Sequence, residues 1–295
     1  MDRIFGALEA GGTKMVCAFG DMNGNILEQQ SIPTTTPQDT MPAIMEFFRE
    51  KKIESVGIGC FGPVDVRQGS STWGTILDTP KLPWRNFNIA GVIKEELGVP
   101  VGIDTDVNGS LLGEVTYGAA KGLTDVVYIT IGTGVGAGIM SGGRLIHGML
   151  HPEAGHIKLI RVKGDDYAGK CPYHKECFEG LASGPAIEER WGEPGRALAD
   201  RPEVWELEAE YIARAIASLV MILSPQRIIL GGGVMHQLQL FPMIREKVIR
   251  EIGGYIKTGE LSDIDGYIVP ASLNDDQGIM GALKLAIDAC GDRQI

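Results

Sequence analysis

The sequence predicts an α/β protein built from two like domains that face one another across a cleft. Short apolar runs alternate with helical patterns along the chain, which is typical of α/β folds. A glycine turn between apolar runs occurs at E-A-G-G-T-K and again, half a chain later, at T-I-G-T-G-V, which indicates an internal repeat. The 295 residues, 44% of them hydrophobic, suffice for two cores. We expect the domains to span residues 1–118 and 119–295.

The first half begins with a predicted three-stranded antiparallel meander. Its strands are the apolar runs Ile4–Ala10, Met15–Phe19 and Ile26–Ser31, which are separated by turn residues. Further along, the patterns predict a helix over about 41–51, a strand over 55–60 and a helix over 89–97. A Pro- and Gly-rich segment over 69–88 precedes the last helix, and a loop of this length inside a compact domain is usually functional.

The first glycine turn is a candidate phosphate site. It consists of Gly11, Gly12, Thr13 and Lys14, so that backbone N–H groups and a hydroxyl can approach a phosphate closely, with a lysine nearby. A plain glycine hairpin has the same pattern. The turn is not a Walker loop, which requires G-x-x-x-x-G-K-[ST] leading into a helix.

Asp106 is the candidate catalytic carboxylate. The stretch V-G-I-D-T-D-V-N (101–108) reads as a buried strand that leads into a helix, and in extended chain Asp104 and Asp106 would share one face. Ligands bind at the carboxyl ends of strands in open α/β sheets, and a carboxylate there can accept a proton from a hydroxyl. A helix cap is one alternative. A calcium loop is another, but its twelfth position would be Val115, with Glu114 one residue early.

The second half repeats the pattern of the first. A strand over 126–131, a turn with Gly132, Thr133 and Gly134, and strands over 137–140 and 144–147 form a second predicted meander. G-T-G-V-G resembles a dinucleotide fingerprint, but strand rather than helix follows its glycines. The remaining expected elements are a helix over 204–223, a strand over 227–230, a turn with Gly232 and Gly233, a helix over 243–252, a strand over 266–269 and a helix over 277–289.

A cluster of soft ligands indicates a zinc site within a loop over about 151–180. Cys171, His174 and Cys177 have C-x2-H-x2-C spacing, and His156 is the expected fourth ligand. Four protein ligands would make the metal structural rather than hydrolytic. Scattered surface cysteines and histidines are the alternative. Glu153 and Glu179 flank the two ends of the loop, so a metal clamp could hold their carboxylates near a polyol substrate.

Composition excludes several classes of partner. A formal charge of −11 and a pI near 5.0 argue against nucleic acid and against an anionic membrane surface. The sequence contains no apolar run of membrane-spanning length, and an acid at position 2 does not suit a secretory signal. We therefore expect a cytoplasmic protein with no nucleic acid and no membrane among its partners.

Taken together, these motifs resemble those of the ROK sugar kinases, within the actin-like, hexokinase-like ATPase superfamily. The resemblance covers the whole chain: L-E-A-G-G-T-K and T-I-G-T-G-V-G-A-G match the phosphate motifs, D-T-D-V-N-G the acid motif, and E-A-G-H with C-P-Y-H-K-E-C-F-E-G the zinc region. It implies two actin-like, ribonuclease H-like domains, Mg2+ with ATP as cofactor, and a structural Zn2+. Implied nucleotide contacts are Gly11, Gly12, Thr13, Lys14, Gly132, Thr133, Gly134, Gly232 and Gly233. Asp106 would be the catalytic base, and Thr105, Asp106, Glu153, His156 and Glu179 would line the sugar pocket.

Two departures from the family pattern bear on the substrate. C-P-Y-H-K-E-C replaces the usual C-x-C-G-x-x-G-C, and Thr105 replaces the Asn that precedes the acid in glucokinases. With T-P-K-L-P-W (79–84) they resemble the bacterial fructokinase branch. The implied activity is ATP-dependent phosphorylation of D-fructose at its 6-hydroxyl, by a protein expected to be a homodimer. A glucokinase, a mannokinase, a non-catalytic sugar sensor and an actin-like structural ATPase remain alternatives.

Overall fold

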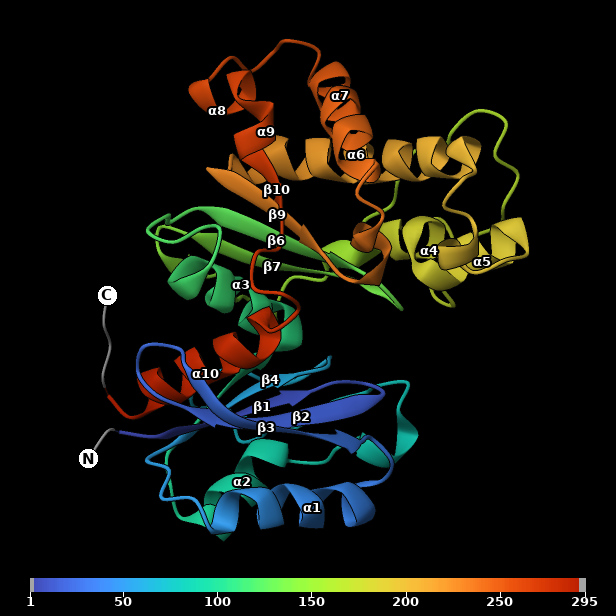
Figure 1. Ribbon diagram of the computed structural model, residues 1–295. Helices are drawn as coiled ribbons and strands as arrows, with labels where there is room; N and C mark the ends of the chain where they lie inside the picture. The colour runs from blue at the N-terminus through green and yellow to red at the C-terminus, as the bar shows by residue number, and fades with distance from the viewer. Residues whose placement is uncertain (1–2, 292–295) are drawn as a thin grey trace. The chain divides into compact units, whose positions relative to one another are not determined.

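The computed structural model describes residues 3–291. These residues form two compact units, each built on a five-stranded mixed sheet (Figure 1). The first unit comprises the described residues of Met1–Gly122, Ile146–His151 and Ser272–Ile295, and the second comprises Leu123–Leu145 and Pro152–Ala271. The structure is therefore α/β with two mixed sheets, as the fold class expected from the sequence requires. Within residues 3–291, none of the helices combines the length and apolarity that a membrane span requires.

The sheet of the first unit has the order β3-β2-β1-β4-β5. β1, β2 and β3 pair antiparallel, as the predicted meander requires, while β4 lies parallel to both β1 and β5. The strands span Phe5–Ala10 (β1), Lys14–Gly20 (β2), Ile26–Pro33 (β3), Val56–Cys60 (β4) and Val101–Thr105 (β5). Because β1, β4 and β5 are parallel, their carboxyl ends meet at one edge.

Helices cover both faces of this sheet (Figure 1). On one face lie α1 (Pro37–Arg49) and α2 (Ile89–Leu97), whose apolar side chains pack in one core with those of β1 and β4. On the other lie α3 (Asp106–Tyr117) and α10 (Gln277–Ala289). A β-carbon on Gly57 would come within 1.8 Å of the Ala282 carbonyl oxygen, so glycine in β4 lets α10 pack directly on the strand backbone.

The expectation that residues 119–295 form one continuous domain is wrong. Helix α10 belongs to the first unit, where Ile279, Ala282 and Leu283 are buried against Phe5 and Ala7 of β1. The segment Ile146–His151 also belongs to the first unit. The amphipathic pattern of a helix predicts that one face is buried, but it does not indicate which sheet covers that face.

The second unit repeats the topology of the first. Its sheet has the order β10-β9-β6-β7-β8, so β6, β7, β8, β9 and β10 correspond in place to β1, β2, β3, β4 and β5. These strands span Val126–Ile131 (β6), Val135–Ser141 (β7), Arg144–Leu145 (β8), Arg227–Gly231 (β9) and Ile268–Pro270 (β10). The predicted internal repeat is visible as this common strand order. β10 begins later than expected because residues 264–267 form a short helix, capped by the Asp263 side chain.

The helices of the second unit include four short ones that the sequence did not predict. The long helices α6 (Pro202–Leu223) and α7 (Leu240–Ile252) match their expected patterns and lie on one face of the second sheet (Figure 1). The short ones are α4 (Phe178–Ala182), α5 (Gly184–Trp191), α8 (Gly259–Ser262) and α9 (Ile264–Tyr267). Single 3-10 turns occur at Leu82–Trp84 (η1), Ala154–His156 (η2), Gly195–Ala197 (η3) and Gly233–His236 (η4).

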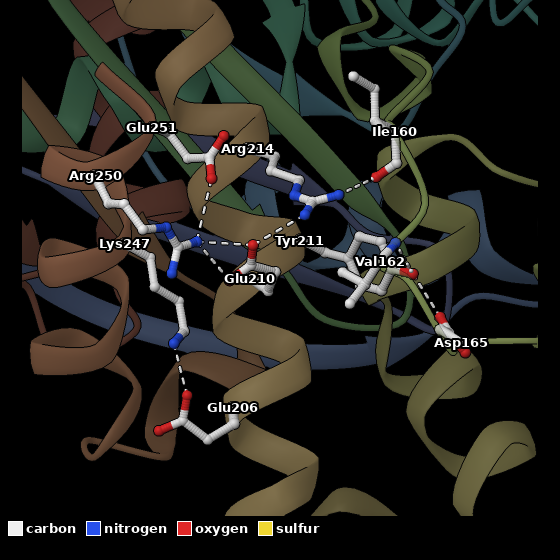
Figure 2. Close-up of polar contacts among 10 residues, drawn as sticks. All are labelled: Ile160, Val162, Asp165, Glu206, Glu210, Tyr211, Arg214, Lys247, Arg250 and Glu251. Atoms are coloured by element: carbon white, nitrogen blue, oxygen red, sulfur yellow. Dashed lines mark hydrogen bonds and ion pairs between the residues drawn. The ribbon is translucent and has the colours of Figure 1, made fainter. Parts of the chain in front are cut away.

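Polar contacts join α6 to α7 and to the loop 151–180 (Figure 2). Lys247 of α7 pairs with Glu206 at 2.6 Å, and Arg250 pairs with Glu210 at 2.7 Å. On the loop side, the Tyr211 hydroxyl donates to Asp165 at 2.5 Å, and Arg214 donates to the carbonyl oxygen of Ile160 at 2.6 Å. The middle of the loop is therefore attached to α6 by contacts that involve no metal ligand.

Candidate functional site

In the first unit, three of the predicted features meet at one sheet edge. The parallel register aligns Ala10 with Cys60 and Cys60 with Thr105. The first glycine turn follows Ala10, a loop that begins at Phe61 follows Cys60, and helix α3 follows Thr105. This edge is where open α/β sheets place their ligands.

The first glycine turn is held in shape by backbone contacts. The N–H of Gly11 donates to the carbonyl oxygen of Glu9 at 3.1 Å, and the Thr34 hydroxyl donates to the Gly11 carbonyl oxygen at 2.8 Å. Thr13 and Lys14 are exposed. The turn thus presents a hydroxyl and an ammonium group on a fixed backbone, which suits an anionic ligand.

Asp106 is the first residue of α3 rather than the last of a strand. The expected shared face with Asp104 therefore does not form, because extended chain ends at Thr105. The Asp106 carboxylate accepts the Val107 N–H at 2.9 Å, and burial raises its pKa from 3.8 to about 6. A group with this pKa is ionised at neutral pH and is a stronger base than an ordinary aspartate.

The cap and calcium interpretations of this stretch are both wrong. Thr105, not an aspartate, is the N-cap of α3, since its side-chain oxygen accepts the Asn108 N–H at 3.1 Å. A calcium loop is not present, because residues 106–117 are helical. The Thr105 side chain is also buried, so this candidate sugar contact has a structural task as well.

Asp104 is part of a buried network that the sequence did not reveal. One carboxylate oxygen accepts from the Thr105 N–H at 2.8 Å and from the Asn108 side chain at 2.7 Å, and the other lies 2.8 Å from Nε2 of His147. The contact with Asp104 raises the pKa of His147 above its ordinary value. Asp104 therefore ties the segment Ile146–His151 to the strand that precedes Asp106.

Glu9 is a second acid at this edge that sequence reasoning missed. Burial raises its pKa to about 7, and the charges of Asp106, Asp276 and Asp275 act in the same direction. Its carboxylate lies against Gly278 in the first turn of α10, where a β-carbon would come within 2.4 Å of it. The signal in the sequence is the acid in L-E-A-G-G-T-K, directly before the glycine turn.

In the second unit, two glycine turns lie at the carboxyl ends of adjacent parallel strands. β6 pairs with β9 in parallel, with Thr130 opposite Gly231. A β-carbon on Gly132 would lie 3.7 Å from the backbone nitrogen of Gly233, so the two predicted nucleotide turns are neighbours. Gly232 has a φ of 89°, a conformation that favours glycine.

Glu179 connects the second glycine turn to the cysteine loop. Its Oε2 accepts the Val135 N–H at 3.1 Å, and a β-carbon on Gly134 would come within 2.8 Å of that oxygen. Glu179 lies in the first turn of α4, whose N-cap is Cys177. Glu153 is exposed and precedes η2, which carries His156. The structure thus places Glu179 on the turn that contains Gly132, Thr133 and Gly134.

The four predicted metal ligands converge. The donor atoms of His156, Cys171, His174 and Cys177 all lie within 4.8 Å of one another. The Nδ1 of His156 lies 3.8 Å from Sγ of Cys171 and 3.6 Å from Sγ of Cys177. Tetrahedral Zn2+ with ordinary bond lengths would separate sulfur from nitrogen by about 3.6 Å. The donor set and its spacing therefore fit zinc.

Comparisons with known proteins agree along the whole chain. The model of the ROK family matches residues 5–289. A putative fructokinase from Bacillus subtilis (strain 168) is 50% identical over 287 residues, covering 97% of this chain and 96% of that protein. A fructokinase from Pediococcus pentosaceus is 45% identical over 283 residues, covering 96% of this chain and 97% of that protein.

A solved structure extends the likeness to the fold. The structure of a ROK family glucokinase from Streptomyces griseus in complex with glucose and AMPPNP matches with a TM-score of 0.78 at 26% identity, covering 97% of this chain and 99% of that one. With a family match over residues 5–289 and relatives of 45–50% identity over nearly the whole chain, this protein belongs to the ROK family.

Proposed function

We propose that the protein transfers the γ-phosphoryl group of ATP to the 6-hydroxyl of a hexose, most readily D-fructose. The observation that carries the proposal is Asp106, a carboxylate at the same sheet edge as the first glycine turn, whose pKa burial raises to about 6. The fructokinase names of relatives at 50% and 45% identity favour fructose, whereas the glucokinase of known structure is only 26% identical.

Asp106 would act as the general base. Its carboxylate takes the proton of the sugar hydroxyl as the oxygen attacks the γ-phosphorus, and most of the rate enhancement comes from positioning and charge neutralisation. The Val107 N–H holds the carboxylate in one orientation, since it donates to Oδ1. The sugar would be held by Thr105, Glu153, His156 and Glu179.

The glycine turns would hold the triphosphate. In the first unit, Gly11, Gly12 and Thr13 offer backbone N–H groups and a hydroxyl. In the second unit, the adjacent turns at Gly132 and Gly233 offer N–H groups of the same kind. Mg2+ bound with ATP would offset phosphate charge that an acidic protein cannot offset. Glu9 and the acids near it are oxygen ligands of the kind that Mg2+ prefers.

The Cys/His cluster would bind one structural Zn2+ through His156, Cys171, His174 and Cys177. Closing this site fixes His156 relative to Cys177, which begins the short helix that carries Glu179. The contacts of Tyr211 and Arg214 with residues 160–165 hold the middle of the loop independently. The zinc would therefore order the two ends of the loop, where the sugar contacts are, more than its middle.

The substrate is tested by a coupled ADP-release assay over a panel of hexoses. We expect fructose to give the highest kcat/KM, with mannose and glucose weaker. A preference for glucose by tenfold or more would refute the fructose assignment and leave hexose phosphorylation intact. If none of the hexoses in the panel supports release of ADP, the proposed kinase activity itself is refuted. Analytical ultracentrifugation of the same sample tests the expected homodimer.

A further inference from the structure

Lys81 lies on the first glycine turn, although it is far from it in sequence. It belongs to T-P-K-L-P-W in the long segment over 69–88. A β-carbon built on Gly12 would come within 2.5 Å of Cε of Lys81 and 3.2 Å of its Nζ. The end of the Lys81 side chain is therefore packed against the turn that presents N–H groups to phosphate.

The fold fixes the backbone on either side of Lys81. Trp84 is buried, its indole N–H donates to the Thr35 carbonyl oxygen at 2.9 Å, and the edge of its ring system meets the ring of Phe61. Arg85 pairs with Asp78 at 2.7 Å and donates to the Thr79 carbonyl oxygen at 3.1 Å. The residues before and after Lys81 are therefore tied to each other, and Trp84 attaches the segment to the rest of the first unit.

Among residues 3–291, the ammonium group of Lys81 has no carboxylate partner. Other partly buried lysines of this chain are paired, such as Lys247 with Glu206 and Lys284 with Asp288. Over residues 3–291, no carboxylate oxygen lies within 4.0 Å of Nζ of Lys81. A cation without a carboxylate beside a glycine turn remains available to an anionic ligand.

We propose that Lys81 contacts the phosphoryl group during transfer and stabilises the charge that develops on it. The inference rests on the proposed kinase function and adds a catalytic residue to it. In the step, the bond from the γ-phosphorus to the β,γ-bridging oxygen breaks and its electron pair leaves with ADP. The sugar oxygen forms the new bond to phosphorus, and the hydroxyl proton passes to Asp106. Lys81 stays protonated throughout and acts only by its charge.

The test compares Lys81→Met and Lys81→Arg with the parent protein on the hexose that the parent phosphorylates best. We expect kcat of Lys81→Met to fall by about 10²- to 10³-fold, the range for removing one transition-state donor. The Kd of the sugar, measured by calorimetry without nucleotide, should change by less than about threefold, since Lys81 acts on the phosphoryl group. Lys81→Arg keeps the charge and should recover at least about tenfold of the lost kcat. Lys121→Met, which removes an exposed lysine elsewhere, is the matched control and should match the parent.

Each other outcome is decisive. A kcat of Lys81→Met within fivefold of the parent would overturn the assignment, as would a large rise in sugar Kd with kcat unchanged, which would make Lys81 a sugar contact. If Lys81→Met melts well below the parent, the Lys81→Arg variant decides the matter. A Lys81→Arg variant that is as stable as the parent but has the low kcat of Lys81→Met contradicts a role for the charge alone. An inactive parent on every hexose would refute the proposed function, whereas an active parent with an equally active Lys81→Met variant refutes only Lys81.

Discussion

Replacing Asp106 by Asn should inactivate the protein and at the same time stabilise it at alkaline pH. Burial raises the Asp106 pKa from 3.8 to about 6, which means that the folded state holds the ionised carboxylate less favourably than the unfolded state does. Each unit of difference corresponds to ~1.4 kcal/mol, so the ionised carboxylate costs the folded state about 3 kcal/mol. Asparagine keeps the oxygen that accepts the Val107 N–H and removes the charge.

The pH window of this effect follows from the same two values. Below about pH 4 the carboxyl group is protonated in both states, and the parent pays no penalty. Between pH 4 and 6 the unfolded state loses its proton first, so the stability of the parent falls as pH rises, and above pH 6 the full penalty is present. We expect Asp106→Asn to melt about 6 °C above the parent at pH 8 and only about 2 °C above it at pH 4.5.

Thermal melts without ligands at both pH values measure the difference in melting temperature between variant and parent. The coupled assay measures the loss of kcat, expected at about 10²- to 10⁴-fold for a lost general base. Asp104→Asn is the matched control. The Asp104 carboxylate accepts bonds from Thr105, Asn108 and His147, so its replacement should lower the melting temperature at pH 8. A variant at Asp106 that melts below the parent at pH 8, or retains kcat within fivefold, would refute the reasoning.

Three further outcomes are expected. Cys177→Ser should lose zinc by elemental analysis and raise the KM for sugar severalfold more than the KM for ATP, and an equal rise in both would contradict a role at the sugar contacts. Gly134→Ala places a β-carbon 2.8 Å from Oε2 of Glu179, so this carboxylate must move and the KM for sugar and the KM for ATP should both rise, while Gly259→Ala, with open space around it, should change neither. His147→Gln removes the imidazole whose contact with Asp104 raises the His147 pKa, so this variant should melt below the parent mainly under pH 6.5, with the difference shrinking as the pH rises through that raised pKa. A pH-independent difference would refute the ion pair with Asp104.

Features set by local sequence were predicted well. Helices α2 and α10 span 89–97 and 277–289, as their apolar periods predict, and the four candidate metal ligands converge as their spacing predicts. Short helices such as α4 were missed because five residues are too few to show a helical period.

Features set by chain segments that meet in space could not be predicted. The contact of Lys81 with Gly12, the pairing of His147 with Asp104 and the return of α10 to the first sheet each join residues distant in sequence. No local pattern specifies such partners. The raised pKa of Glu9 has the same origin, since Asp106 and Asp276 come from distant parts of the chain.

The internal repeat also shows that, of the two equivalent sheet edges, the one in the first unit carries the proposed catalytic base. β10 occupies in the second sheet the place of β5 in the first. Helix α3 begins directly after β5, so its first residue, Asp106, lies at the sheet edge, whereas Ala271 follows β10 and six residues separate that strand from α10. The next residue, Ser272, donates hydrogen bonds from its N–H and its hydroxyl to the Glu114 carboxylate, so its polar groups serve a structural contact. We expect the kcat of the parent to fall as the pH drops through about 6, where Asp106 takes up a proton, and the residual activity of Asp106→Asn should lack this acidic limb. A variant that kept the limb would show that another group, such as Glu9 with its raised pKa, is the base.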